Sequence, residues 1–291
     1  MAAPGELVDE ERAATPIRID LRRVMAAKNP ALPALVPRAL LRYLDRIVHV
    51  EELNCALREL AELDGAGFAR GALAYLGARV EARYDRRLDG VQRPVVVANH
   101  PLGGLDGLAL LVTVADHIPD VVMPANDLLM SLAPLRSVLV PVNKHGSNRE
   151  NRGRFDDAFA GERAVVHFPA GLCSRKKGGA VRDLEWQKSF IVRARRYQRP
   201  IVPVHVEGRN SEFFYNLARL RRWLGFRFNA EMVYLVDEMF KQRDRTITLT
   251  FGRPIPPQRL SGATSESDWE LASRLRRHVY VLARDPDREF R

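Results

Sequence analysis

The chain has 291 residues, with 46 basic against 36 acidic side chains, a net charge of +10 and a hydrophobic content of 46%. This length and composition suit one large domain or two unequal ones, and they exclude disordered, collagen-like and coiled-coil proteins. The two cysteines, at 55 and 173, exclude a disulfide framework and fit a reducing compartment. The acidic N-terminal sequence predicts no signal peptide, and no run approaches the ~20 apolar residues that span a bilayer.

The N-terminal third is expected to be an arm followed by helices. Residues 1–30 are polar and charged, which predicts a loosely held arm. From Asp45 to Leu63 apolar residues recur at intervals of three and four, which predicts an amphipathic helix, and a second helix is expected from Phe68 to Tyr84. Residues 31–88 are therefore expected to form a helical, membrane-proximal segment. Either it packs as a layer on the main domain, or one apolar face rests on a bilayer.

From residue 94 onward, short β-branched runs alternate with longer helical patterns, which is typical of a sheet buried on both faces. The expected strands are Pro94–Ala98, Asp120–Met123, Ser137–Val142, Ala164–Phe168, Ile201–Val206, Met232–Val236 and Thr246–Phe251. The expected helices are 106–117, 126–135, 148–160, 183–197, 211–223, 238–243 and a last one at 268–283, where Ser267 and Glu270 have capping-box spacing. The prediction is an α/β fold: a mostly parallel seven-stranded sheet flanked by helices, with an N-terminal helical segment.

The sharpest motif is VVVANHPLGGLDGLALL at 95–111, where a strand, a glycine-rich turn and an apolar helix follow one another. His100 stands at the end of the strand, where α/β folds place their active sites. Gly103 and Gly104 allow a tight turn, so that Asp106 can reach back to the imidazole and leave one ring nitrogen free as a base. Asp106 can also act as a helix N-cap, and both roles can hold together.

The octapeptide at 99–106, Asn-His-Pro-Leu-Gly-Gly-Leu-Asp, resembles the NHx4D box of the PlsC-like glycerolipid acyltransferase family. The resemblance implies that His100 is the general base on the acceptor hydroxyl and that Asp106 orients it. It also places Asn99 and Gly103 among the substrate-binding residues. Backbone N–H groups near Gly103 or Gly171 are candidate donors to an oxyanion.

A second segment, HFPAGLCSRKKGG at 167–179, resembles the family's FPEGTRS block, which binds the acceptor phosphate. The substrate-binding residues that carry over are Phe168, Pro169, Gly171, Ser174 and Arg175. Ala170 and Leu172 replace the family's Glu and Thr, and Cys173 replaces its Arg, which argues against a glycerol-3-phosphate acceptor. A solvated basic turn is the alternative interpretation of this segment. Its basic residues are also expected to lower the pKa of Cys173, which keeps a thiol nucleophile as an alternative to a pocket-lining role.

Two further segments complete the resemblance, which spans residues 90–255. PIVPVHVEGR at 200–209 is similar to a strand that lines the family's acyl or acceptor pocket, and Lys144 and Arg149 are candidates for contact with the acceptor. The sequence from 168 onward is most similar to bacterial hemolysin-like acyltransferases, including O-acyltransferases of glycine and ornithine lipids. The resemblance thus assigns 89–255 to a PlsC-like acyltransferase domain, followed by a C-terminal helix at 256–291.

The function implied is transfer of a fatty acyl group from acyl carrier protein or coenzyme A to the hydroxyl of a lyso-lipid. The expected acceptor is a lyso-amino-acid lipid, and a lysophospholipid or lysophosphatidate is the alternative. A basic peripheral membrane or nucleic-acid-binding protein without catalysis is the alternative of another class. No cofactor is expected beyond the acyl thioester as co-substrate, and no nucleic-acid partner. No metal is expected either, because His145, His167 and His205 lack carboxylates at ligand spacing.

The positive charge predicts polyanionic partners, namely an acidic carrier protein and an anionic membrane surface. Only six of the 46 basic residues are lysines. The expected location is cytoplasmic, peripheral on the inner face of the cell membrane. Within the chain, residues 208–228 mix aromatic side chains with arginines. That pattern is compatible with nucleic-acid stacking, with a lipid-facing amphipathic helix or with plain packing.

Overall fold

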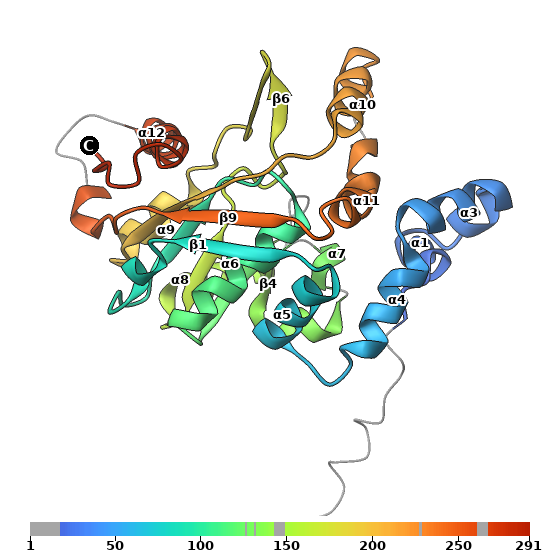
Figure 1. The fold of residues 1–291 in the computed structure, drawn as a ribbon, viewed down its shortest axis with the longest axis horizontal. Helices are drawn as coiled ribbons and strands as arrows, with labels where there is room; N and C mark the ends of the chain where they lie inside the picture. Colours follow the sequence, from blue (N-terminus) through green and yellow to red (C-terminus); the bar gives the residue numbers. More distant parts are fainter. Residues whose placement is uncertain (1–17, 126, 131, 143–148, 227–228, 261–266) are drawn as a thin grey trace, which may run out of the picture. The chain divides into compact units, whose positions relative to one another are not determined.

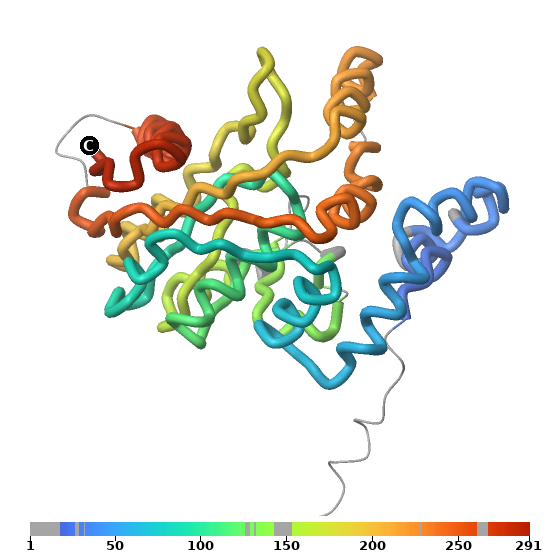
Figure 2. The backbone as a smooth tube through the Cα atoms, in the orientation of Figure 1, coloured from blue at the N-terminus to red at the C-terminus, as the bar shows by residue number. Residues whose placement is uncertain are grey.

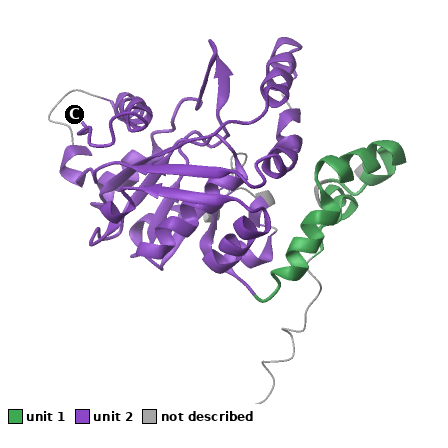
Figure 3. Ribbon diagram, in the orientation of Figure 1, with its two compact units in different colours: residues 1–62 green, residues 63–291 purple. Residues whose placement is uncertain are grey.

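The computed structural model describes residues 18–125, 127–130, 132–142, 149–226, 229–260 and 267–291. The chain divides into two compact units, residues 1–62 and 63–291 (Figure 3). The predicted segment 31–88 is divided between these units. Among the described residues, no helix is both long enough and apolar enough to cross a bilayer.

Between residues 18 and 62 the first unit contains four short helices: α1 (Leu21–Lys28), α2 (Leu32–Leu35), α3 (Arg38–Ile47) and α4 (Val50–Glu59). The predicted arm at 1–30 therefore includes a helix, which Asp20 caps by accepting from two backbone N–H groups, while residues 1–17 lie outside the described residues. The Asn54 side chain exchanges two hydrogen bonds with the backbone of Ile19, at 2.7 and 3.0 Å, and so ties the start of the unit to α4.

The single helix predicted from Asp45 to Leu63 is wrong. His49 has a φ of 51°, and this left-handed residue separates α3 from α4. The reason for the error is that hydrophobic spacing of three and four continues across a break of two residues, so periodicity alone does not reveal the break.

The second unit is built on a seven-stranded sheet in the order β1-β9-β8-β2-β5-β3-β4 (Figures 1 and 2). The strands are β1 (Arg79–Arg83), β2 (Val95–Ala98), β3 (Val121–Ala125), β4 (Leu139–Pro141), β5 (Ala164–His167), β8 (Ile201–Val206) and β9 (Thr246–Phe251). All neighbouring pairs are parallel except β8 with β9. The predicted α/β class with a mostly parallel seven-stranded sheet is confirmed.

Several elements differ from the prediction, and the helix predicted at 183–197 begins only at Ser189. The segment 68–84 is not one helix, because α5 (Gly65–Tyr75) is followed by β1, whose alternating exposed and half-buried residues form an edge strand. The strand predicted at Met232–Val236 is instead a 3-10 turn, η4 (Ala230–Tyr234), leading into α11 (Leu235–Phe240). A short apolar run is compatible with either a buried strand or a buried helix, and here tertiary packing decides for the helix.

Helices and short turns surround the sheet. They are η2 (Asp85–Leu88), α6 (Gly104–His117), α7 (Asp127–Met130), η3 (Ala133–Val138), α8 (Arg149–Ala160), α9 (Ser189–Arg196), α10 (Glu212–Trp223), η5 (Pro257–Leu260) and α12 (Asp268–Val281). The capping box of Ser267 and Glu270 at the start of α12 is confirmed. A separate antiparallel hairpin joins β6 (Arg175–Lys177) to β7 (Ala180–Arg182).

One hydrophobic core lies between the sheet and the helices α8, α9 and α12. Val95 and Val97 of β2 contribute to it from the centre of the sheet, and Phe159, Phe190 and Leu275 contribute from the helices. Burying such side chains contributes roughly 1.5–3 kcal/mol each. The core thus fixes β2, and the carboxyl end of β2 is where the predicted catalytic motif begins.

Candidate active site

Asn99 anchors the end of β2 to the end of β8. Its buried amide donates to the carbonyl of Val206 at 2.8 Å and accepts from the N–H of Val206 at 2.7 Å. Both polar atoms of this predicted substrate-binding residue are therefore bonded to backbone. Because β2 and β8 run parallel, this pair of hydrogen bonds holds the turn after β2 at the carboxyl edge of the sheet.

The turn brings His100 and Asp106 together. Gly103 has a φ of 85°, which favours glycine, and α6 begins at the next residue. Asp106 is fully buried in the first turn of α6, and its Oδ1 lies 3.0 Å from Nδ1 of His100. Its Oδ2 accepts from the backbone N–H of Leu102 at 2.9 Å. The carboxylate thus lies against the imidazole, as the sequence predicts. The predicted N-cap role of Asp106 is wrong, because Gly103 is the N-cap of α6 and Asp106 lies within its first turn.

This geometry suits a general base. A carboxylate beside Nδ1 fixes the imidazole tautomer and leaves Nε2 to take a proton from a substrate. The ring of Phe168 stacks on the imidazole, with centroids 4.2 Å apart and planes inclined by 30°. The His100 side chain stays 18% exposed, so that a substrate can reach it. Among the described residues, no group of three or more His, Cys, Asp and Glu is placed to hold a metal ion.

Asp183 is a second buried carboxylate at this turn, and the sequence analysis missed it. One oxygen accepts from the backbone N–H of His100 at 3.0 Å and from the hydroxyl of Ser174 at 2.6 Å. The other accepts from the Trp186 indole at 2.8 Å, and the N–H of Asp183 donates to the hydroxyl of Tyr280 at 2.7 Å. Burial raises the pKa of Asp183, although these hydrogen bonds oppose the rise.

No sequence signal separates Asp183 from its neighbours. Glu185 stands two residues on in the same DLEW segment and is exposed. A buried acid is recognised by its partners in space, and two of these, His100 and Tyr280, lie 83 and 97 residues away in the chain.

The segment predicted to bind substrate, 168–175, lies beside the catalytic turn. The N–H of Ser174 donates to the carbonyl of His100 at 2.7 Å. Gly171 has a φ of 65°, and its N–H donates to the carbonyl of Phe168 at 3.0 Å. The carbonyl of Pro169 accepts from Gln187 at 3.0 Å. The N–H of Gly171, one of the two predicted oxyanion donors, is thus bonded within this turn.

Arg175 lies in a buried ion-pair network. Its guanidinium donates to Glu231 at 2.9 Å and to the carbonyl of Cys173 at 2.8 Å. Arg221 donates to the other oxygen of Glu231 at 2.8 Å, so one buried carboxylate is shared by two arginines. Of the other two basic candidates, Lys144 lies outside the described residues, and Arg149 begins α8 without a described side chain.

Cys173 lies in a small buried cluster with Phe214 and Tyr215. Burial raises the pKa of its thiol to about 11, even though Arg175 opposes this. The prediction that the basic turn lowers this pKa is therefore wrong. A thiol with this pKa is protonated at neutral pH, so it is a poor nucleophile and fits a packing role.

A sequence model of the acyltransferase family matches residues 23–288. The chain belongs to this acyltransferase family. It is 41% identical over 253 residues to a lyso-glycine lipid O-acyltransferase of Bacteroides thetaiotaomicron, over 86% of this chain and 93% of that protein. It is 40% identical to a protein of the same name from Phocaeicola vulgatus, over 86% of this chain and 91% of that protein.

Among solved structures, the acyltransferase is similar to the 1-acyl-sn-glycerophosphate acyltransferase PlsC of Thermotoga maritima. The sequences are 16% identical, the TM-score is 0.47, and the match covers 92% of this chain and 96% of that one. The family model and the two relatives confirm the predicted membership of the PlsC-like glycerolipid acyltransferases, and the protein is an enzyme that transfers acyl groups.

Proposed function

We propose that this acyltransferase moves a fatty acyl group from a thioester to the hydroxyl of a lyso-lipid, with His100 as the general base. The observation that carries the proposal is the contact of 3.0 Å between Nδ1 of His100 and the buried Oδ1 of Asp106 at the carboxyl edge of the sheet. The two relatives named as lyso-glycine lipid O-acyltransferases support a lyso-lipid as the acceptor.

In the proposed reaction, Nε2 of His100 takes the proton of the acceptor hydroxyl while the oxygen attacks the thioester carbonyl. A carbon–oxygen bond forms, and the resulting tetrahedral intermediate expels the thiolate as the carbon–sulfur bond breaks. The imidazolium returns its proton to the thiolate, so that an ester and a free thiol leave. Asp106 stabilises the imidazolium, and no acyl-enzyme is needed because the thioester is already activated.

The preferred acceptor is an N-acylated amino acid that carries a 3-hydroxyl, as in lyso-glycine lipid. Ala170 and Leu172 stand where phosphate-binding relatives have Glu and Thr, and neither can join a polar network around a phosphate. A site that lacks such groups no longer prefers an acceptor with a phosphate over one without. Arg175 is bonded to Glu231, so it does not replace the missing groups.

The proposed donor is acyl carrier protein or coenzyme A, and the proposed place is the inner face of the cell membrane. The net charge of +10 supports both, because carrier proteins are acidic and basic side chains near an anionic leaflet contribute about 1 kcal/mol each. Comparing both thioesters with one acceptor at two salt concentrations tests the donor. A carrier protein held by charge gives a KM that rises with salt.

An acceptor assay with one donor tests the proposed function. The acceptors are N-(3-hydroxyacyl)glycine, the corresponding ornithine compound, lysophosphatidate, a lysophospholipid and glycerol-3-phosphate, and thiol release is the readout. We expect an N-acylated amino acid to give the highest kcat/KM and glycerol-3-phosphate the lowest. Lysophosphatidate as the fastest acceptor would leave the reaction class standing and overturn the amino-acid acceptor. Glycerol-3-phosphate as the fastest would overturn the argument from Ala170 and Leu172.

A further inference from the structure

Helix α10 is apolar on two faces, of which one is buried in the second unit and the other is largely exposed, with Phe213 packed edge-on against Tyr234. Phe214, Tyr215 and Ala218 are buried, and the first two of these lie in the cluster around Cys173. The other apolar side chains of α10, at 213, 217, 220 and 223, recur at intervals of three and four and line an open hollow along the helix. A helix that is apolar on its solvent side as well is unusual for a surface element of a globular protein.

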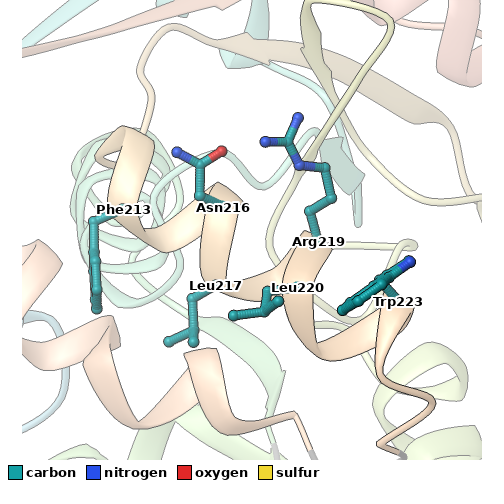
Figure 4. A pocket seen from close by; sticks show the side chains of 6 residues that line it. All are labelled: Phe213, Asn216, Leu217, Arg219, Leu220 and Trp223. Carbon is teal, nitrogen blue, oxygen red and sulfur yellow. The ribbon is translucent and has the colours of Figure 1, made fainter.

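The uncovered face carries large side chains in the open. Trp223 is 80% exposed, and Phe213 and Leu220 are each 49% exposed. Leu224 and Phe226, directly after the helix, are 51% and 64% exposed. Figure 4 shows the apolar side chains along the helix, and Asn216 and Arg219 line the same hollow. Contiguous exposed apolar surface of this kind marks an interaction site, whereas scattered single residues do not.

Basic side chains border this face. Arg219 and Arg222 are exposed on α10, and Lys177 and Arg182 are exposed on the neighbouring β6–β7 hairpin. Lys176 of the hairpin donates to Glu212 at the start of α10 at 2.7 Å, which joins the two elements. In Figure 1 the hairpin and α10 rise on the same side of the sheet. Aromatic and aliphatic side chains bordered by arginines and lysines match the chemistry of an anionic lipid leaflet.

The catalytic turn and α10 belong to the same edge of the sheet. The loop from the end of β8 to α10 passes against the turn: Gly208, with a φ of 154°, lies so close to Leu102 that a Cβ there would approach its Cδ2 to 2.9 Å. Leu102 stands between His100 and Asp106 in the sequence. A leaflet that receives α10 therefore lies near the edge at which His100 meets its acceptor.

We propose that the apolar face of α10, with Leu224 and Phe226, inserts shallowly into an anionic lipid leaflet and holds the active-site edge there. The role of this docking in catalysis rests on the proposed function, because a lyso-lipid acceptor with one acyl chain resides in the leaflet. The docking itself does not depend on that function. An acidic carrier protein would need the arginines but not the aromatic face, and it is an outcome of the test below.

The first experiment measures binding of the full chain to vesicles of phosphatidylcholine with phosphatidylglycerol, by sedimentation. The variant L220S/W223S removes two exposed side chains of this face. We expect its partition to fall at least about tenfold, because each large apolar side chain withdrawn from water contributes more than that factor when fully buried. The matched control is Trp269→Ser, which removes a tryptophan that is 46% exposed on α12, and it is expected to bind like the wild type.

The second experiment uses tryptophan fluorescence with brominated lipids. The variant W269F retains Trp186 and Trp223, and its emission is expected to be quenched by the vesicles. The variant W223F retains Trp186 and Trp269, and its emission is expected to be unchanged. Wild-type partition by L220S/W223S, or equal quenching of the two variants, overturns the proposal. The proposal is also overturned if, without vesicles, carrier protein or a second copy of the chain changes the emission of Trp223 with the same affinity as the vesicles do.

Activity separates this inference from the proposed function. L220S/W223S is expected to keep wild-type kcat/KM on a short-chain, monomeric acceptor in solution and to lose activity on the same headgroup embedded in vesicles. If the wild type transfers no acyl group to any acceptor while the vesicle results hold, the proposed function fails and the docking surface stands. If acyl transfer holds and the vesicle results fail, the docking surface alone is overturned.

Discussion

Asp183 joins the catalytic turn to three other segments of the chain. Its two oxygens accept from the His100 backbone, the Ser174 hydroxyl and the Trp186 indole, and its N–H reaches Tyr280. Burying a carboxylate costs free energy unless hydrogen-bond partners satisfy it. A fully satisfied network makes the residues around it more rigid. We regard Asp183 as a positioning residue, because it bonds the backbone of His100 and not its imidazole.

The substitution Asp183→Asn replaces one acceptor oxygen by a donor, so at least one of the three incoming hydrogen bonds is lost. A misplaced base costs on the order of 100-fold in rate. We expect kcat to fall by about 10–100-fold with little change in KM, while circular dichroism shows a folded protein. Glu185→Gln is the control, since Glu185 is exposed, and it keeps wild-type kcat. A wild-type kcat in folded Asp183→Asn contradicts the positioning role.

At the scale of residues, the sequence predicts the contact of His100 with Asp106 but not the network around Asp183 that holds the turn. His100 and Asp106 follow a strand with a glycine turn between them, and their spacing alone predicts their contact. Asp183 meets His100 and Tyr280, which lie 83 and 97 residues away in the chain, only through the fold. Arg175 is basic in a basic turn, and nothing local indicates that a buried Glu231 lies opposite it.

At the scale of elements, Arg199 holds the end of α8 against two loops. Its guanidinium is fully buried and donates to four backbone carbonyls, those of Arg93, Ala158, Phe159 and Arg163. Burial lowers the pKa of Arg199 to about 10, so the side chain stays charged at neutral pH. Carbonyls at a helix C-terminus have no partner within the helix, and a buried cation there satisfies them.

Replacing this guanidinium leaves those carbonyls without their donor. We expect Arg199→Met to lower the free energy of unfolding by about 3 kcal/mol or more, because hydrogen bonds to charged groups contribute roughly 1.5–3 kcal/mol each and are not fully additive. Urea denaturation gives the value. The exposed neighbour provides the control, and Arg196→Met should change stability by less than about 0.5 kcal/mol. Equal free energies of unfolding for the two variants would show that the hydrogen bonds of Arg199 do not stabilise the fold.

His117 ends α6 between two carboxylates. Its Nδ1 lies 2.7 Å from Asp89 and its Nε2 lies 2.9 Å from Asp85, so both ring nitrogens are best satisfied in the charged form. Partial burial opposes this charge, but the two carboxylates outweigh it and raise the pKa of His117 above 6.5. The imidazolium therefore ties α6 to η2 and the residue that follows it.

A raised pKa in the folded state gives stability that is present in full below the unfolded pKa and is lost as the pH rises through the folded pKa. We expect the stability difference between the wild type and His117→Gln to be largest near pH 5.5 and to shrink toward pH 9. The double variant Asp85→Asn/Asp89→Asn should lose the same dependence. A difference that grows between pH 7 and pH 9 contradicts this assignment.

Some elements are predictable from the local sequence, whereas others depend on contacts with distant residues. Buried strands such as β2 and β9 are continuous β-branched runs, and the sequence places them within one residue. β1 is an edge strand with charged residues at alternate positions, and the sequence pattern does not separate it from the preceding helix. The 232–236 run became η4 and α11 because the flanking Glu231 and Glu238 are buried against Arg175, Arg221 and Ser211.

At the scale of the whole molecule, the order of the strands in the sheet cannot be predicted from the sequence. The chain order predicts parallel pairing, but not that β2 lies between β8 and β5, nor that β9 reverses beside β8. That order places the loops after β2, β5 and β8 beside one another. It explains why the NHPLGGLD turn, the 168–175 segment and the start of α10 converge although more than 100 residues separate the first from the last.

The central claim, that His100 is the base for acyl transfer to a lyso-lipid hydroxyl, is tested most directly by one measurement. Acceptor-dependent thiol release is compared between the wild type, His100→Ala and His49→Ala, where His49 has a similarly shielded side chain (23% against 18% exposed). Loss of a general base costs ~10²–10⁴-fold in rate, so His100→Ala is predicted to fall by that factor and His49→Ala to match the wild type. Wild-type turnover by a folded His100→Ala protein would contradict the account.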